Sequence, residues 1–269
     1  MSITATNGSG LGNRIKAIVS SMRLHSDARV YWPKVPGVLS CELSDLFLNE
    51  FEIAAPQGKQ YSSWRFALKK TDQIPEGFSL VTADKDKIGR KFSFTDPRRR
   101  NIDLEFHRIP SEIRDEYVSI FNRLQINPTV QQWVENFSHN FDKNTVSVHI
   151  RSWEDQDPDE ESRLRQKHFF SLNNFIQEMY KFDNNTKFFV CSDSQKVIAK
   201  LEKLFYNRII TYRRHSKLET SRSTRIGAQD DLAEMLLLSK NKVILGSYIS
   251  TFTEMAWWFG GAKAEVRIC

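Results

Sequence analysis

Polar side chains follow an expected strand near the middle of the chain, and they are suited to binding a phosphorylated ligand. His149 and Arg151 close the β-branched run 145–150 and are two residues apart, so the alternation of a strand sends both side chains to the same side. Arginine offers a rigid fork of donors that matches phosphate oxygens and stays charged at any working pH. A structural ion pair between Arg151 and Glu154 or Asp155 explains the same residues equally well.

Two further stretches carry hydroxyl groups at comparable places. Ser192 and Asp193 follow the expected strand 187–191 and could bond a ribose or a base, although capping the next helix is the commoner role of such residues. Ser250 and Thr251 stand where the final helix should begin. With the N–H of Phe252 they form a ready anion site, and capping is again the alternative.

A glycine-rich turn stands near the start of the chain. It spans Gly10, Gly12, Asn13 and Arg14, between a short β-branched run at 3–6 and a helical pattern beginning near Ile15. Glycines let a backbone approach a ligand, and the helix behind the turn offers unpaired N–H groups. The full G-x-G-x-x-G spacing with a downstream acid is missing, so we do not expect a dinucleotide site.

The elements that must position these residues alternate between strand and helix, which predicts an α/β fold with parallel sheets. A polar break at 142–144 separates an N-terminal domain, 1–143, from a C-terminal domain, 144–269. The region 56–110 is irregular, and 43–51 indicates a short amphipathic element. We expect strands at 3–6, 28–32, 145–150, 187–191, 209–212 and 242–245, and helices after residue 14 and at 111–124, 128–137, 172–180, 197–205, 230–238 and about 251–260.

Composition narrows the class of protein. The 269 residues are 40% hydrophobic, which is enough for a substantial core. No apolar window is long enough to span a bilayer and no secretory signal begins the chain, so we expect a cytoplasmic protein without an integral membrane segment. Three scattered cysteines do not suggest a disulfide framework or a zinc site.

The ordered motifs resemble the superfamily of inverting fucosyltransferases that includes nodulation and core α-1,6-fucosyltransferases, α-1,2-fucosyltransferases and protein O-fucosyltransferases. The matching stretches are Gly10-Leu11-Gly12-Asn13-Arg14, His149-Ile150-Arg151, Cys191-Ser192-Asp193 and the segment 231–261. The resemblance implies a GT-B-like architecture, in which two Rossmann-like domains face each other across a cleft. It also implies a GDP-fucose donor held mainly by the C-terminal half, a glycan or other hydroxyl acceptor, and no metal or other cofactor.

The resemblance also implies roles for particular residues. Arg151 would contact the β-phosphate and His149 would lie against the nucleoside. Ser250, Thr251 and the N–H of Phe252 would bind phosphate. The guanine would be held by Glu234, with Asp231 as the alternative, and Asn13 would position the acceptor or the sugar beside Arg14. Gly10, Gly12, Ser192 and Asp193 complete the expected donor site.

The expected chemistry follows from the leaving group. Departure of GDP places negative charge on the β-phosphate, which Arg151 and a helix N-terminus can stabilise without a metal. A base for the acceptor hydroxyl would come from the carboxylates Glu154, Asp155, Asp157 and Asp159, where like charges can raise a pKa. A solvated acidic loop is the alternative for most of them.

Two other functions compete with this interpretation. The charge of +6, the run Arg98-Arg99-Arg100 and 12% aromatic residues would fit a basic nucleic-acid-binding protein. We do not expect nucleic acid as a partner, because the positive charge is scattered among acidic residues and no binding motif is present. A non-catalytic GT-B-like protein that binds a sugar nucleotide is the other alternative.

Overall fold

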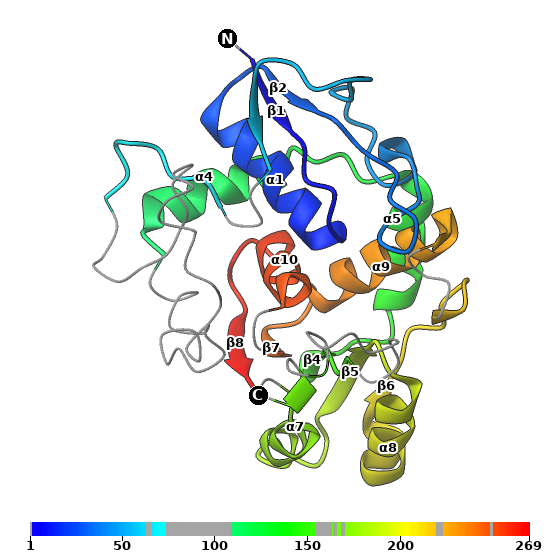
Figure 1. Ribbon diagram of the computed structural model, residues 1–269. Helices are drawn as coiled ribbons and strands as arrows, with labels where there is room; N and C mark the ends of the chain where they lie inside the picture. The colour runs from blue at the N-terminus through cyan, green and yellow to red at the C-terminus, as the bar shows by residue number, and fades with distance from the viewer. Residues whose placement is uncertain are drawn as a thin grey trace. The chain divides into compact units, whose positions relative to one another are not determined.

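The computed structural model describes residues 2–62, 66–73, 109–153, 163, 166–167, 170–218, 223–247 and 250–269. Its contacts divide the chain into two compact units, whose elements are labelled in Figure 1. The N-terminal unit comprises the described residues within 1–91, 107–133 and 214–233. The C-terminal unit comprises those within 134–213 and 234–269. The predicted domain boundary at 143/144 stays a prediction.

A parallel sheet of order β2-β1-β3 forms the centre of the N-terminal unit. Its strands are β1 (Ile3–Ala5), β2 (Ala28–Val30) and β3 (Lys59–Tyr61). Helix α1 (Leu11–Leu24) connects β1 to β2 and packs on both. This β-α-β order is the one predicted, whereas β3 lies in a stretch that the sequence pattern describes only as irregular.

Helix α1 begins earlier than the glycine-rich turn suggests. Its first residue is Leu11 and Gly10 is the N-cap, so Asn13 and Arg14 lie in the first helical turn rather than in a loop. Most apolar positions of α1 are buried, with Met22 and Leu24 half-buried, and the helix packs against α4 (Ser111–Phe121), in which Tyr117 is buried. The predicted helical periodicity of both segments is confirmed.

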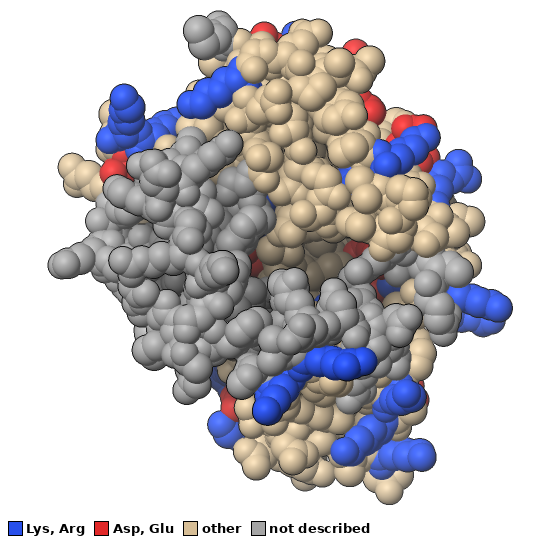
Figure 2. All heavy atoms as spheres, in the orientation of Figure 1, with Lys and Arg blue, Asp and Glu red and all other residues tan. Residues whose placement is uncertain are grey.

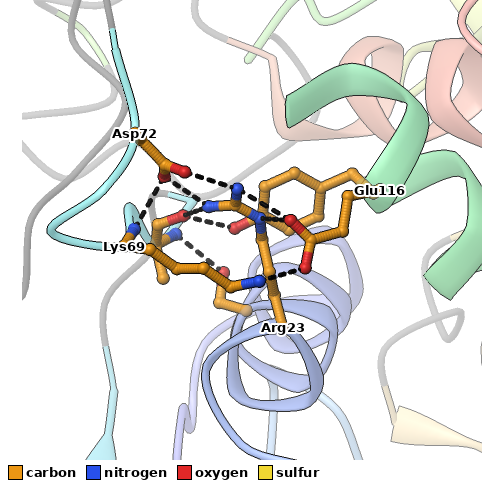
Figure 3. A network of polar contacts seen from close by, with 7 residues as sticks. Arg23, Lys69, Asp72 and Glu116 are labelled. Atoms are coloured by element: carbon orange, nitrogen blue, oxygen red, sulfur yellow. Dashed lines mark hydrogen bonds and ion pairs between the residues drawn. The ribbon is translucent and has the colours of Figure 1, made fainter. Parts of the chain in front are cut away.

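Polar contacts also hold α1 and α4 together (Figure 3). The buried guanidinium of Arg23 in α1 donates to both oxygens of Asp72, at 2.6 and 2.8 Å, and its Nε donates to Glu116 of α4 at 3.0 Å. Lys69 pairs with the second oxygen of Glu116. Asp72 and Lys69 thereby attach the segment 66–73 to α1 and α4.

The C-terminal unit contains a parallel sheet of order β6-β5-β4-β7-β8. Strand β4 (Thr145–Ile150) is central, and residues 145–150 are the six that the sequence predicts. Its neighbours are β5 (Lys187–Ser192) and β7 (Val243–Gly246). The outer strands are β6 (Ile209–Ile210) and β8 (Glu265–Ile268). This parallel sheet between helices confirms the predicted α/β class.

The alternation along β4 separates the core of this unit from its polar site. Val146, Val148 and Ile150 pack in one apolar cluster with α7 (Leu172–Met179) and α8 (Gln195–Phe205). Ser147 and His149 therefore point to the opposite face. Figure 1 shows α7 and α8 on one side of the sheet and α10 (Thr251–Phe259) on the other.

Several element boundaries differ from the sequence prediction. Strand β8 was not expected, β6 is shorter than 209–212, and the segment 43–51 contains only the single turn η1 (Leu43–Asp45). Helix α9 (Arg225–Leu238) begins five residues before the predicted 230. Helix α5 (Pro128–Ser138) begins at the predicted residue and ends one residue later than predicted. Both α5 and α9 are divided between the units, after Trp133 and Ala233.

The described helices include none that is long and apolar enough to cross a membrane. On the face drawn in Figure 2, lysine and arginine side chains of the described residues are visible in several groups. One of these groups lies over α8, whose exposed lysines are Lys196, Lys200 and Lys203. The run 98–100 lies outside the described residues.

Candidate functional site

His149 lies near the carboxyl end of β4 with its ring buried. Its Nδ1 is 2.8 Å from Oγ1 of Thr253 and 3.5 Å from Oγ of Ser250. The ring stacks on Phe252 with a centroid distance of 4.8 Å. Burial lowers the pKa of His149 to about 4, so the imidazole is neutral at physiological pH.

The N-terminus of α10 supplies the other side of this contact. Ser250 occupies the N-cap position, but its side chain makes no capping hydrogen bond. Its hydroxyl lies near His149 instead, so capping does not account for this residue. The first helical turn carries unpaired N–H groups that favour an anion, and the acidic Glu254 in that turn opposes one.

Gly246 at the end of β7 permits the close approach of α10. A Cβ atom at this position would lie 2.4 Å from Cγ2 of Thr253, which is far inside van der Waals contact. Trp257 and Trp258, further along α10, are buried core residues. Sequence reasoning missed both Gly246 and Thr253, although a glycine directly after an apolar strand is a recognisable sign of close backbone approach.

Arg151 is held at both its backbone and its side chain. Its backbone N–H donates to Oγ of Ser247 at 2.7 Å, and the same hydroxyl donates to the carbonyl of His149 at 3.2 Å. Its Nη1 donates to Asp193 at 2.7 Å. Ser247 therefore links the ends of β4 and β7, and Asp193 is an ion-pair partner of Arg151. Glu154 and Asp155, the partners considered from the sequence, lie outside the described residues.

Asp193 uses its carboxylate within the protein. Besides Arg151, it accepts hydrogen bonds from the backbone N–H and the hydroxyl of Ser152, at 2.6 and 3.0 Å, and from the N–H of Trp153 at 3.1 Å. Trp153 has a left-handed backbone with φ of 55°, a conformation that needs such support in a non-glycine residue. These contacts favour a role in positioning the segment 151–153.

The two serines beside Asp193 have local roles. Oγ of Ser194 accepts from the N–H of Val197 at 3.4 Å and caps α8. Oγ of Ser192 accepts from the N–H of Ser194 at 3.2 Å. The side chain that caps α8 is therefore that of Ser194, and the contacts of Ser192 and Asp193 described above are not capping contacts.

The acidic residues of α9 lie in different environments. Asp231 accepts a hydrogen bond from Nη2 of Arg214 at 2.6 Å. Glu234, one turn later, is half-buried and belongs to the C-terminal unit with His149 and Arg151. These two are the residues considered for guanine.

Asp230, which sequence reasoning did not single out, is fully buried. It accepts hydrogen bonds from the N–H groups of His215 and Ser216, from the Ser216 hydroxyl, and from Nδ1 of His215. Burial raises the pKa of this carboxyl, but the hydrogen bonds from Ser216 and His215 outweigh it and leave the pKa below its usual value. His215, which lies among the basic residues Arg213, Arg214 and Lys217, thus attaches its loop to α9.

Arg14 in the N-terminal unit is also buried. Its guanidinium donates to the carbonyls of Ser9 and Pro33, both at 2.6 Å, and of Gly8 at 3.3 Å, and it lies over the ring of Trp32. Burial lowers its pKa. The arrangement favours a structural role, in which Arg14 fixes the glycine-rich turn.

Gly10, Gly12 and Asn13, which are close to Arg14 in the chain, have different surroundings from it. A Cβ atom at Gly10 would meet nothing within 4 Å, so the backbone there faces open space. Gly12 is buried inside α1. Within the described part of the chain, Oδ1 of Asn13 is buried without a hydrogen-bond partner, which is unusual for a buried carbonyl oxygen.

The proposed catalytic carboxylates Glu154, Asp155, Asp157 and Asp159 lie outside the described residues. Over the described ranges, no group of histidine, cysteine or acidic side chains has the geometry to hold a metal ion. The donors gathered in the C-terminal unit are the guanidinium of Arg151 and the hydroxyls and N–H groups at the start of α10. Such a set can bind an oxyanion.

Comparisons with known proteins agree with this fold. No protein-family model matches the sequence, and no curated protein matches it. Among solved structures, similarity extends over nearly the whole chain to the NodZ α-1,6-fucosyltransferase. A crystal soaked with GDP-fucose has a TM-score of 0.54 and 15% identity, with 96% of this chain and 92% of that chain covered.

Two other NodZ structures are similar to the same extent. NodZ co-crystallised with GDP has a TM-score of 0.53 and 14% identity over 95% of this chain and 91% of that chain. NodZ from Bradyrhizobium has a TM-score of 0.54 and 15% identity over the same shares, 95% and 91%. The chain therefore has the fold of these GT-B-like fucosyltransferases, as the sequence resemblance predicted.

Proposed function

We propose that this protein is a glycosyltransferase that moves fucose from GDP-fucose to a glycan or other hydroxyl acceptor, with inversion and without a metal ion. The fold is that of the NodZ α-1,6-fucosyltransferase, which was crystallised with GDP and soaked with GDP-fucose, and this supports the class of reaction. The ordered motifs of the sequence support it independently of the fold.

One observation carries the proposal. Within the C-terminal unit, Arg151 and the N-terminus of α10 meet the buried His149 at the carboxyl edge of a parallel sheet. This edge is where α/β proteins bind their ligands. A positive side chain, a helix N-terminus and a neutral imidazole together suit a nucleoside diphosphate.

In the proposed reaction the bond between the anomeric carbon of fucose and the β-phosphate oxygen breaks. The negative charge that grows on the β-phosphate is stabilised by Arg151 and by the N–H groups of α10, assisted by Ser250 and Thr251. The acceptor oxygen attacks the opposite face of the sugar, and a carboxylate such as Glu154 or Asp159 takes its proton. Asn13 positions the acceptor or the sugar.

The guanine completes the donor complex. We assign it first to Glu234, which belongs to the same unit as His149 and Arg151, and keep Asp231 as the alternative. A carboxylate can accept from both N1 and N2 of guanine, which adenine cannot reproduce. The assignment therefore predicts discrimination against ADP.

The test is a calorimetric titration of the full chain in EDTA with GDP-fucose, GDP-mannose, GDP and ADP. The proposal expects binding of GDP and GDP-fucose without added metal, weaker binding of GDP-mannose, and no measurable binding of ADP. Indifference to all the guanine nucleotides would refute it.

A further inference from the structure

We propose that Thr253 is a positioning residue, which holds the ring of His149 in the tautomer protonated at Nδ1 and leaves Nε2 as a hydrogen-bond acceptor for a hydroxyl of the nucleotide donor. This rests on the proposed function for the identity of the ligand. The claim about the tautomer concerns the protein alone and can be tested without any ligand.

The geometry around Nδ1 supports this role. Two hydroxyl oxygens face that nitrogen, Oγ1 of Thr253 at 2.8 Å and Oγ of Ser250 at 3.5 Å. A neutral imidazole has one N–H donor and one acceptor nitrogen. A hydroxyl can donate or accept, and we assign the proton to Nδ1 because one N–H can be donated to the nearer oxygen and still be attracted to the second.

The ring has little freedom to choose another arrangement. It is stacked on Phe252 with an interplanar angle of 20°, and Thr253 is itself only 1% exposed. Burial also keeps the imidazole neutral near pH 7. Phe252 fixes the plane of the ring, and Thr253 holds the proton on Nδ1. Nε2 therefore carries a lone pair and can act only as a hydrogen-bond acceptor.

Gly246 provides an independent way to disturb Thr253. A methyl group there would lie 2.4 Å from Cγ2 of Thr253 and 3.1 Å from its Oγ1. Gly246→Ala should therefore displace the side chain of Thr253, which still keeps its hydroxyl group. If the contact with His149 matters, this variant should reproduce the effect of removing the hydroxyl.

The experiment uses the full chain with ¹⁵N-labelled histidine. The His149→Gln spectrum assigns the signals of His149 among the six histidines. We expect His149 to be protonated at Nδ1 near pH 7 in the wild type and in Thr253→Ser, which keeps the hydroxyl. We expect a mixture of tautomers in Thr253→Val, which has the same shape without the hydroxyl, and in Gly246→Ala.

The affinity for GDP is measured on the same samples. Loss of one hydrogen bond to an oriented ring should weaken GDP binding roughly three- to tenfold in Thr253→Val, and Thr253→Ser should restore it to within about twofold. Protonation of wild-type His149 at Nε2, or an unchanged tautomer and GDP affinity in Thr253→Val, would overturn the proposal. If the wild type does not bind GDP either, the proposed function fails, while its spectrum still decides the role of Thr253.

Discussion

The guanidinium of Arg151 lies 2.7 Å from the carboxylate of Asp193, although 42 positions separate them in the chain. The register of two parallel strands accounts for this contact. Ile150 of β4 pairs with Ser192 of β5, so the next residue on each strand emerges at the same edge of the sheet. The ion pair is therefore a direct consequence of how β4 and β5 align.

This alignment predicts the effect of Asp193→Asn. The carboxylate accepts four hydrogen bonds from residues 151–153, and an amide cannot replace all of them. We expect the free energy of unfolding to fall by about 1 to 3 kcal/mol. We also expect weaker binding of GDP, because Arg151 loses the partner that orients it.

Urea denaturation of the variant measures the first effect, and Asp183→Asn is the matched control because Asp183 is exposed in the same unit. Equal stability of the two variants would show that the contacts of Asp193 contribute little.

The buried His149 predicts a pH dependence of stability. Its pKa is lowered from 6.5 to about 4 in the folded protein, so the unfolded chain binds a proton between these values while the folded chain does not. Stability is complete above about pH 6.5 and declines as the pH falls toward 4. The total loss attributable to this group is about 3 kcal/mol.

The measurement compares the free energy of unfolding at about pH 7 and about pH 4.5 for the wild type and for His149→Gln. The variant should lose less stability on acidification than the wild type. His139→Gln, which changes an exposed histidine of the same unit, should behave like the wild type. Identical slopes for wild type and His149→Gln would contradict the burial of a neutral imidazole.

The network around Arg23 predicts a large effect on stability (Figure 3). The side chain of Arg23 is 2% exposed and that of Asp72 is 7% exposed. Arg23→Met keeps much of the volume but leaves two carboxylates near one another without their common partner. We expect a loss of about 3 to 5 kcal/mol.

The exposed pair of Arg29 and Asp27 supplies the control, because its side chains are 43% and 51% exposed. Arg29→Met should cost no more than about 1 kcal/mol. Thermal melting of both variants tests the difference, and similar melting temperatures would mean that the Arg23 network contributes no more than a surface pair.

The elements of the C-terminal unit could be predicted closely because their signals are local. In the run 145–150 every second residue, Val146, Val148 and Ile150, is apolar and β-branched. Ser171 and Ser194 stand at the starts of two helices with clear apolar periodicity. The β-α-β start of the N-terminal unit was recognisable for the same reason. Strand β3 was missed because its three residues show no alternation. Strand β8 alternates between polar and apolar residues, but four residues are the shortest run in which alternation indicates a strand.

The contacts of the candidate site were less accessible to sequence reasoning. That Arg151 would pair with Asp193 depends on strand order and register, which a single sequence does not specify. The donation of Arg14 to the carbonyls of Ser9 and Pro33 also depends on how the turn folds, which the residue types alone do not specify. The approach of Thr253 to His149 depends on the absence of a side chain at Gly246, a tertiary effect.

The most direct test of the proposed donor site is the ratio of GDP affinity to GMP affinity, measured by calorimetry in EDTA. If Arg151 and the start of α10 hold the β-phosphate, the wild type should bind GDP at least about tenfold more tightly than GMP, since a hydrogen bond to a charged group contributes about 1.5 to 3 kcal/mol. Arg151→Ala should remove most of that difference and keep a folded protein, whereas Arg213→Ala, at an exposed arginine, should preserve it. A destabilised Arg151→Ala protein with the same GDP to GMP ratio as the wild type would contradict the role of this arginine.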